Sequence, residues 1–123
     1  MVEVILYVAD QARSRDFYTA VLRKAPVLDV PGMTEFELAE NLKLGLMPEK
    51  GIARILCPFT PHPEKGNGIP RCELYLMDAD PAASLKRAVD AGARPVSAAV
   101  PRDWGHTVAY CADPDGHIIA FAC

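Results

Sequence analysis

The chain has 123 residues, half of them apolar and about a quarter charged, with a formal net charge of −3. This length suffices for one domain with its own core. The weak negative charge and the lack of a basic cluster argue against nucleic-acid binding. No apolar run approaches the roughly 18 residues of a membrane span. The four cysteines form no Cys-x-x-Cys pair, so we expect reduced thiols in a cytoplasmic protein.

The first half of the chain predicts one strand, one helix and three further strands. Residues 2–8 are mostly β-branched or aliphatic, which favours a strand rather than a signal peptide. Asp10 is a suitable N-cap for a helix over residues 11–23. Three short strands are then expected at residues 27–30, 34–39 and 42–47.

The second half predicts the same order of elements. A strand is expected at residues 72–77, and Asp80 precedes a helix with Pro81 in its first turn and Gly92 at its end. The apolar face of this helix is predicted to hold Ala82, Leu85, Ala88 and Val89. Further strands are expected at residues 94–98, 107–111 and 117–122. The last two should form an antiparallel hairpin, because ADPDG at residues 112–116 has the composition of a tight turn.

A proline-rich segment connects the two halves. Residues 48–70 contain five prolines and three glycines, a composition that predicts irregular structure. The segment is long for a plain connector in a compact domain, so it is either a linker between the halves or a flap over a site. Its short apolar piece, residues 52–56, is the part expected to be ordered.

The two halves also resemble each other in sequence. When the chain is shifted by seventy residues, six of the twelve residues in 3–14 are identical to those in 73–84. The identical pairs are Glu3/Glu73, Leu6/Leu76, Ala9/Ala79, Asp10/Asp80, Ala12/Ala82 and Ser14/Ser84. Two strand–cap–helix starts could converge on such letters, but the shared order of elements favours duplication. We therefore predict an α+β fold of two tandem βαβββ modules, residues 1–48 and 71–123, in one domain.

Duplication has a structural consequence for any site. Each module is a small curled sheet with one helix and is too small to bury both faces. We expect the modules to lie side by side about a pseudo-twofold axis, with a curled mixed sheet around a cleft. Matching residues would then face each other across this cleft.

The motifs of the chain resemble those of a known superfamily. The segments ADQARSRDFYTAVL, LGLMPE, ELYLMDADPAASLKRAVDAGA and DWGHTVAYCADPDGHIIAF look like the vicinal oxygen chelate superfamily. That group includes glyoxalase I, bleomycin-resistance proteins, extradiol dioxygenases and fosfomycin-resistance enzymes. The resemblance covers nearly the whole chain except much of the proline-rich segment. It implies a fold rather than one activity, because this scaffold supports isomerisation, ring cleavage and sequestration.

The resemblance also implies where a divalent metal would be held. Metal enzymes of the superfamily take ligands from the first and last strands of each module. The first-strand positions fall on Glu3 and Glu73, with Cys72 adjacent if the register differs by one. The last-strand positions, usually Glu, fall near Gly45 and Ala120, which offer no side-chain ligand. The usual four-ligand metal site is therefore not expected, which argues against glyoxalase activity.

The paired glutamates are the first candidate site residues. Two carboxylates facing a partly apolar cleft would share a proton, bind a cation or pair with a base such as Arg71 or Arg102. Glu3 and Glu73 thus predict a site for a cationic or amine-bearing ligand, or a weak two-carboxylate metal site completed by water. The alternative is that both are exposed or form ordinary salt bridges.

Trp104 and His106 are the second pair of candidates. Trp104 is the sole tryptophan and could stack a planar ligand or a cation. His106 could act in acid–base chemistry, although a surface or hydrogen-bonded histidine is the commoner case. His117 in the terminal turn indicates fold rather than chemistry. Cys72 and Cys111 could be nucleophiles, but buried, inert thiols in strands are favoured.

These observations lead to two main hypotheses about function, beside the further alternative of a scaffold that has lost its site. The first is a homodimeric protein that binds a small organic molecule in the cleft lined by Glu3, Glu73, Trp104 and His106, without the usual metal site. The second is a divalent-metal-dependent lyase, isomerase or dioxygenase with an altered ligand set. Whether the protein is an enzyme is left open, and neither a nucleic-acid nor a membrane partner is expected.

Overall fold

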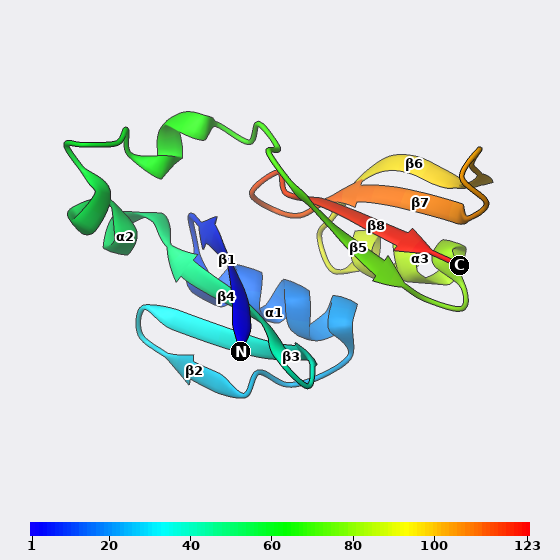
Figure 1. Ribbon diagram of the computed structural model, residues 1–123, viewed down its shortest axis with the longest axis horizontal. Helices are drawn as coiled ribbons and strands as arrows, with labels where there is room; N and C mark the ends of the chain where they lie inside the picture. Colours follow the sequence, from blue (N-terminus) through cyan, green and yellow to red (C-terminus); the bar gives the residue numbers. More distant parts are fainter. The chain divides into compact units, whose positions relative to one another are not determined.

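The computed structural model describes residues 1–123 and divides the chain into two compact units, residues 1–67 and 68–123 (Figure 1). Each unit contains a four-stranded sheet and at least one helix, which confirms the predicted α+β class. No helix is both long enough and apolar enough to cross a membrane. We describe each unit by itself.

The first unit is built from a βαβββ module followed by a short helical segment. Its elements are β1 (Val2–Val8), α1 (Gln11–Leu22), β2 (Leu28–Val30), β3 (Met33–Ala39), β4 (Leu42–Pro48), α2 (Glu49–Leu56) and the 3₁₀ helix η1 (Pro63–Gly66). The strand order is β1-β4-β3-β2, with β1 parallel to β4 and the other pairs antiparallel. The five elements predicted in this half are confirmed.

The core of the first unit lies between α1 and one face of the sheet. Successive side chains of a strand point to opposite faces, so Leu44 and Leu46 share a face while Lys43 and Gly45 lie on the other. Phe36 pairs with Leu44 and is also fully buried. The helix contributes its own buried side chains to this core: Ser14, Phe17, Tyr18 and Val21. The alternation of β4 thereby separates a packed face from a face that carries charged residues.

The proline-rich segment is more ordered than its composition predicts. Residues Glu49–Leu56 form the helix α2, which confirms the order expected at residues 52–56 and shows that the expectation of irregular structure is wrong for residues 49–51. The physical reason is that no proline occurs between Pro48 and Pro58, which leaves one stretch free to make helical hydrogen bonds. Glu49 in the first turn and Arg54 in the last turn also complement the helix dipole.

The second unit repeats the topology of the first. Its elements are β5 (Glu73–Met77), α3 (Pro81–Asp90), β6 (Arg94–Pro101), β7 (Thr107–Ala112) and β8 (Ile118–Ala122). The strand order is β5-β8-β7-β6, again with the first strand parallel to the last and the other pairs antiparallel. The predicted second βαβββ module and the predicted β7–β8 hairpin are both confirmed.

Two of the repeated residue pairs have the same structural role in both modules. The side chain of Asp10 accepts a hydrogen bond from Arg13 N at 3.0 Å, and that of Asp80 accepts one from Ala83 N at 3.1 Å. Both aspartates are therefore N-caps, which satisfy otherwise unpaired amides at the helix start. Ser14 and Ser84 are buried one turn later. These shared local roles explain why the two modules have identical residues at these positions.

The apolar face of α3 differs from the prediction. Its buried residues are Pro81, Ser84 and Ala88, whereas Ala82 is exposed and Val89 is 37% exposed. Ser84 can enter the protein interior because its hydroxyl donates to Asp78 Oδ2 at 2.6 Å. The buried face of α3 therefore includes a hydrogen-bonded serine, and a search for apolar residues alone does not identify this face.

The ADPDG turn between β7 and β8 is organised by one buried carboxylate. Asp113 accepts hydrogen bonds from the amides of Asp115 and His117 at 2.9 and 2.8 Å, and from His117 Nδ1 at 2.8 Å. An ionised carboxylate can only accept, so Nδ1 carries the proton. Gly116 follows at φ +95°, a left-handed conformation that favours glycine. This geometry supports the interpretation of His117 as a fold residue.

We predict that Asp113→Ala lowers the free energy of unfolding by about 2–3 kcal/mol, because it leaves buried donors of the turn without their charged acceptor. The measurement is urea denaturation followed by circular dichroism. The control is Asp103→Ala, which removes an exposed aspartate and should cost less than about 0.5 kcal/mol. Equal effects of the two substitutions would contradict the role given to Asp113.

Candidate functional site

Three charged side chains lie on the face of the first sheet that points away from α1. β1 and β4 run in parallel register, with Glu3 beside Lys43, and Glu35 of β3 pairs with Gly45 of β4. Lys43 Nζ donates to Glu35 Oε1 at 3.0 Å. Glu3, Glu35 and Lys43 are thus brought together by three neighbouring strands, and we call them the charged cluster.

Gly45 forms the floor of this cluster. It is buried, and a Cβ atom at this position would collide with Glu3 Oε1 and crowd Ile5 and Met33. A larger residue would not fit at position 45 without moving Glu3, because the carboxyl group of Glu3 lies directly over Gly45. The space that a larger residue would fill is already taken by a side chain of the same module.

The surroundings of Glu3 favour its neutral form. Burial is the main cause that raises the pKa of this carboxyl above 4.5, and the negative charge of Glu35 adds to it. A hydrogen bond to Glu35, which only protonated Glu3 can donate, acts in the same direction, while Lys43 opposes it. Oε1 of Glu3 is itself buried without a hydrogen-bond partner.

Glu73, the repeat partner of Glu3, has a different environment. It is exposed at the first residue of β5, and its neighbour in β8 is the apolar Ile118. The expectation that Glu3 and Glu73 face each other concerns the arrangement of the two units and stays a prediction. Of the expected basic partners, Arg102 instead donates to Ser97 Oγ at 2.7 Å and lies over the ring of Tyr110 at 5.2 Å.

The second unit brings Trp104 and His106 together through a residue that the sequence analysis did not select. Trp104 Nε1 donates to the hydroxyl of Tyr75 at 3.0 Å, and that hydroxyl lies 2.7 Å from His106 Nδ1. Because the hydroxyl accepts from Trp104, it can donate its own proton to Nδ1 of a neutral imidazole. The rings of Tyr75 and His106 are 5.9 Å apart between centroids. We call Tyr75, Trp104 and His106 the aromatic cluster.

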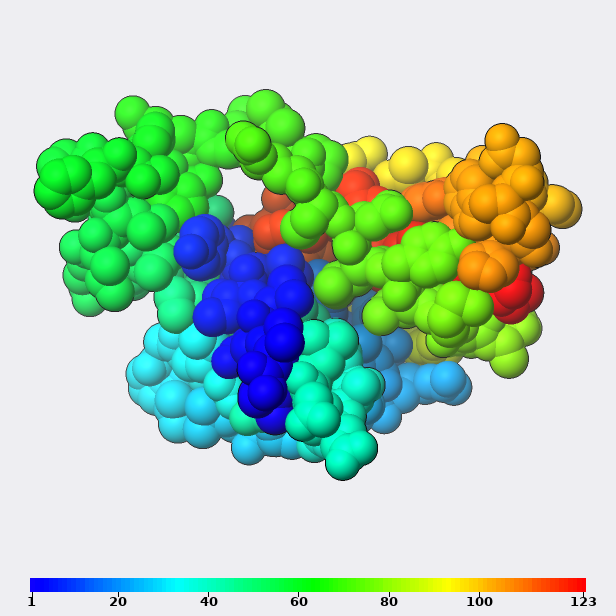
Figure 2. All heavy atoms as spheres, in the orientation of Figure 1, coloured from blue at the N-terminus to red at the C-terminus, as the bar shows by residue number.

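The aromatic cluster is accessible although its groups are held in place. Trp104 is 54% exposed and Tyr75 is 37% exposed. Gly105, between Trp104 and His106, has φ +99°, which allows the sharp turn that aims both rings at Tyr75. The segment around residues 101–105 (orange) lies at the surface of the second unit in Figure 2. Because hydrogen bonds already hold these exposed rings in place, their side chains would lose little conformational entropy when a ligand stacks on them.

The position equivalent to Gly45 in the second module is Ala120. It pairs with Tyr75 on one side and Tyr110 on the other, and it is fully buried. Ala120 belongs to a small apolar cluster with Val108 and Ala122, against which Tyr110 packs. Neither Gly45 nor Ala120 leaves an open space on its sheet, because neighbouring side chains cover each of them.

The donor set does not fit the metal site that the resemblance implies. Gly45 and Ala120 provide no side-chain ligand, and the space above Gly45 holds the Glu3 carboxyl. The cation beside the Glu3–Glu35 carboxylate pair is the Lys43 ammonium. A divalent ion there would meet an adjacent positive charge and a carboxyl whose neutral form is favoured. We therefore derive no chemistry through a metal.

Two residues of the charged cluster and one of the aromatic cluster were missed in the sequence. Tyr75 lies two positions after Glu73 in the same strand, so strand alternation places both on one face. Glu35 and Lys43 alternate with buried residues in the same way. The sequence pattern that indicates them is a polar residue at every second position of a strand whose other residues are apolar. Their pairing across strands depends on register, which the sequence does not state.

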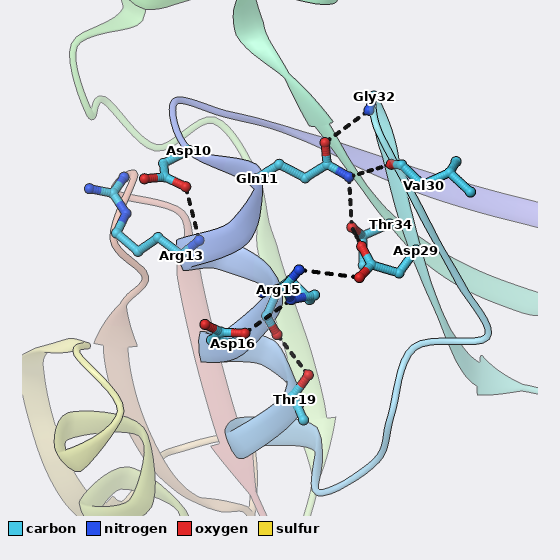
Figure 3. A network of polar contacts seen from close by, with 10 residues as sticks. All are labelled: Asp10, Gln11, Arg13, Arg15, Asp16, Thr19, Asp29, Val30, Gly32 and Thr34. Carbon is cyan, nitrogen blue, oxygen red and sulfur yellow. Dashed lines mark hydrogen bonds and ion pairs between the residues drawn. The ribbon is translucent and has the colours of Figure 1, made fainter.

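A separate hollow of about 290 Å³ lies between the start of α1 and the β2–β3 turn, beside the polar network drawn in Figure 3. Gln11 Nε2 donates to Val30 O and Thr34 Oγ1, and its Oε1 accepts from Gly32 N. Arg15 pairs with Asp16 and Asp29, and Thr34 also donates to Asp29. Because the polar groups lining this hollow bond to one another, we interpret the network as an anchor for the turn rather than a ligand site. The residues that line the hollow are Gln11, Ala12, Arg15, Asp29, Val30 and Pro31.

The cysteines divide by exposure. Cys111 is fully buried in β7, and burial raises the pKa of its thiol to about 11, with the charge of Asp113 adding to the effect. Such a thiol is a poor nucleophile at neutral pH, which agrees with the prediction. Cys72 is exposed and precedes β5, so the expectation that it is buried in a strand is wrong.

Comparison with known proteins gives a match over nearly the whole chain. Residues 1–121 match the profile of the Glyoxalase/Bleomycin resistance protein/Dioxygenase superfamily. No protein with curated function matches the sequence. A glyoxalase-related enzyme from Fulvimarina pelagi has a similar structure, with a TM-score of 0.84 and 22% identity over 99% of this chain and 86% of that one.

Two further solved structures show the same likeness. A glyoxalase/bleomycin resistance protein/dioxygenase family enzyme from Burkholderia phytofirmans has a TM-score of 0.78 and 15% identity, over 98% of this chain and 94% of its own. A glyoxalase/bleomycin resistance protein/dioxygenase from Nocardioides has a TM-score of 0.74 and 19% identity, over 98% and 80%. At these identities the structures show the fold alone.

We predict that Glu3→Gln raises the melting temperature at neutral pH. The folded-state pKa of Glu3 lies above its unfolded value, so folding favours the protonated form, which glutamine mimics. The wild type loses this contribution as the pH rises through the folded pKa. The gap between variant and wild type should therefore close below about pH 4, where both states are protonated. Glu37→Gln, at an exposed carboxylate of β3, is the control. A gap that widens in acid would contradict the raised pKa.

We predict that Cys111 reacts with a disulfide reagent far more slowly than Cys72 and Cys123 in the folded protein. Cys72 and Cys123 are exposed, whereas Cys111 is buried and its raised pKa keeps the thiolate scarce. Mass spectrometry of the labelled peptides at successive times measures the three rates. In denaturant the rates should converge, and early labelling of Cys111 in the folded protein would show that its thiol is accessible.

Proposed function

Because the chain belongs to the glyoxalase/bleomycin resistance protein/dioxygenase superfamily, we propose that it binds a small, planar organic molecule and does so without the usual four-ligand metal site. The observation that supports this proposal most is the aromatic cluster. Trp104 offers an exposed indole face, and Tyr75 fixes its orientation by a hydrogen bond. Stacking on such a ring favours flat, unsaturated ligands.

His106 adds a polar group to the same surface. Its Nδ1 is engaged by Tyr75 at 2.7 Å, which orients the imidazole and sets the proton of a neutral ring on Nε2. An N–H at this position can donate to a carbonyl, carboxylate or phenol oxygen of a molecule stacked on Trp104. The proposed ligand is therefore planar and carries an oxygen acceptor at its edge.

The charged cluster extends the proposal to the first module. The Glu35–Lys43 ion pair is balanced in charge, and burial raises the pKa of the neighbouring Glu3 carboxyl. Such a face suits a neutral polar group of a ligand better than a free cation. Glu3, Glu73, Trp104 and His106 remain the proposed ligand-binding residues, and the homodimer and a cytoplasmic location remain part of the proposal. The free state of all four cysteines supports a reducing compartment.

The alternative, a lyase, isomerase or dioxygenase that depends on a divalent metal, has less support from the donor set. Gly45 and Ala120 cannot act as ligands, and Lys43 places a positive charge beside the available carboxylates. An enzyme of this class would need an altered ligand set, for which Glu3 and Glu73 were the candidates. Binding of the organic ligand without metal, in the presence of a chelator, separates the two functions.

We predict that planar aromatic oxygen compounds quench the fluorescence of Trp104, the sole tryptophan, in a saturable manner. The probes are benzoate, phenol and acetophenone, each titrated with a chelator present. Tyr75→Phe keeps the ring but removes both hydrogen bonds of its hydroxyl, at about 1 kcal/mol each. We expect the variant to bind the best probe roughly tenfold more weakly.

The control for this prediction is Tyr18→Phe, which removes a hydroxyl from the buried core of the first unit. It should change stability without changing affinity, so a loss of binding in Tyr75→Phe alone is assigned to the aromatic cluster. Failure of all three probes to saturate, or equal affinity of Tyr75→Phe and wild type, would overturn the proposal.

A further inference from the structure

The charged cluster consists of two carboxylates and one ammonium group on one sheet face. Glu3 comes from β1, Glu35 from β3 and Lys43 from β4, the strand between them. The side chain of Glu35 is only 15% exposed and that of Lys43 is 30% exposed, so water screens their 3.0 Å ion pair incompletely. Glu3 Oε1 is buried over Gly45 and lacks a hydrogen-bond partner.

The one ammonium group of the charged cluster is already engaged by the protein's own carboxylates. The hydrogen bond to Glu35 is the main cause that raises the pKa of Lys43 above its ordinary value, so its ammonium stays charged at neutral pH. Glu3 and Glu37 contribute further negative potential at Lys43. The ammonium pairs with Glu35, and burial raises the pKa of the neighbouring Glu3 carboxyl. A second cation would therefore have to displace Lys43 from Glu35 or bind directly beside it.

We propose that the Lys43 ammonium is the resident cation of the Glu3–Glu35 carboxylate pair and keeps divalent metal ions out of the first module. This inference rests on the disagreement between the donor set and the metal site of the superfamily, and it does not depend on the proposed organic ligand. Lys43 acts by position and charge, and it takes part in no covalent step.

The effect follows from simple electrostatics. An ammonium group and a metal ion held side by side repel each other, and more strongly where water screens their charges incompletely. A divalent ion that bound both carboxylates would either meet this repulsion or displace Lys43 from Glu35. Removal of the ammonium eliminates the repulsion and leaves two carboxylates that can bind a hard cation together with water.

The test is Lys43→Met, which keeps an unbranched side chain and removes the charge. Mn²⁺ alone is titrated into the full chain by isothermal calorimetry at neutral pH. Lys43→Met should bind Mn²⁺ at least roughly tenfold more tightly than the wild type does. Adding Glu3→Gln to Lys43→Met should abolish the gain. Lys43→Gln, which keeps a polar end group, provides a second variant if the methionine protein does not fold.

The matched control is Lys86→Met, which removes the lysine of another ion pair. Lys86 lies 2.9 Å from Asp90 on the exposed surface of α3, so its loss should not create an Mn²⁺ site. Wild-type binding of Mn²⁺ that Glu3→Gln abolishes would overturn the proposal. A folded Lys43→Met or Lys43→Gln protein without a gain would overturn it as well. Binding of benzoate or phenol in either case leaves the ligand proposal standing, so the two can fail separately.

Discussion

The alternation of side chains in strands is the constraint on which the rest of the structure depends. β4 places Leu44 and Leu46 in the core and Lys43 and Gly45 on the opposite face, where they meet residues of β1 and β3. The hydrophobic pattern that fixes the core therefore also fixes which polar residues can meet. A shift of one residue in β4 would bury Lys43 and dissolve the charged cluster. Stability of the core and chemistry of the other face cannot be varied independently here.

The two modules show how a repeat can keep its folding signals while its chemistry diverges. Asp10 and Asp80 cap equivalent helices, so selection for a stable helix start suffices to preserve both. Glu3 and Glu73 are identical too, yet one lies half-buried beside Lys43 and the other is exposed beside Ile118. The neighbouring strand decides what a glutamate does. Identity of letters in a repeat is thus evidence for fold and weak evidence for a shared site.

The sequence predicts the elements well and the contacts between them poorly. Periodicity and caps locate both βαβββ modules, because these signals are local and each acts within a few residues. Only residues 52–56 of the helix α2 were expected to be ordered, because proline density was averaged over the whole connecting segment, although residues 49–56 contain none. Tyr75 and His106 are 31 positions apart, and their hydrogen bond exists only through the pairing of β5, β8 and β7. Such a pair is set by register and loop geometry, which local patterns do not carry.

The charges and aromatic groups of the modules suggest how a fold associated with metal chemistry can recognise ligands without metal. A divalent ion supplies concentrated positive charge and fixed geometry, and both must then come from side chains. Lys43 supplies positive charge in the first module, but its pairing with Glu35 leaves none in excess. In the second module Tyr75 supplies fixed geometry by holding Trp104 and His106. Recognition built in this way favours shape and hydrogen bonding over charge, so neutral or weakly polar planar molecules are the class that we propose for these surfaces.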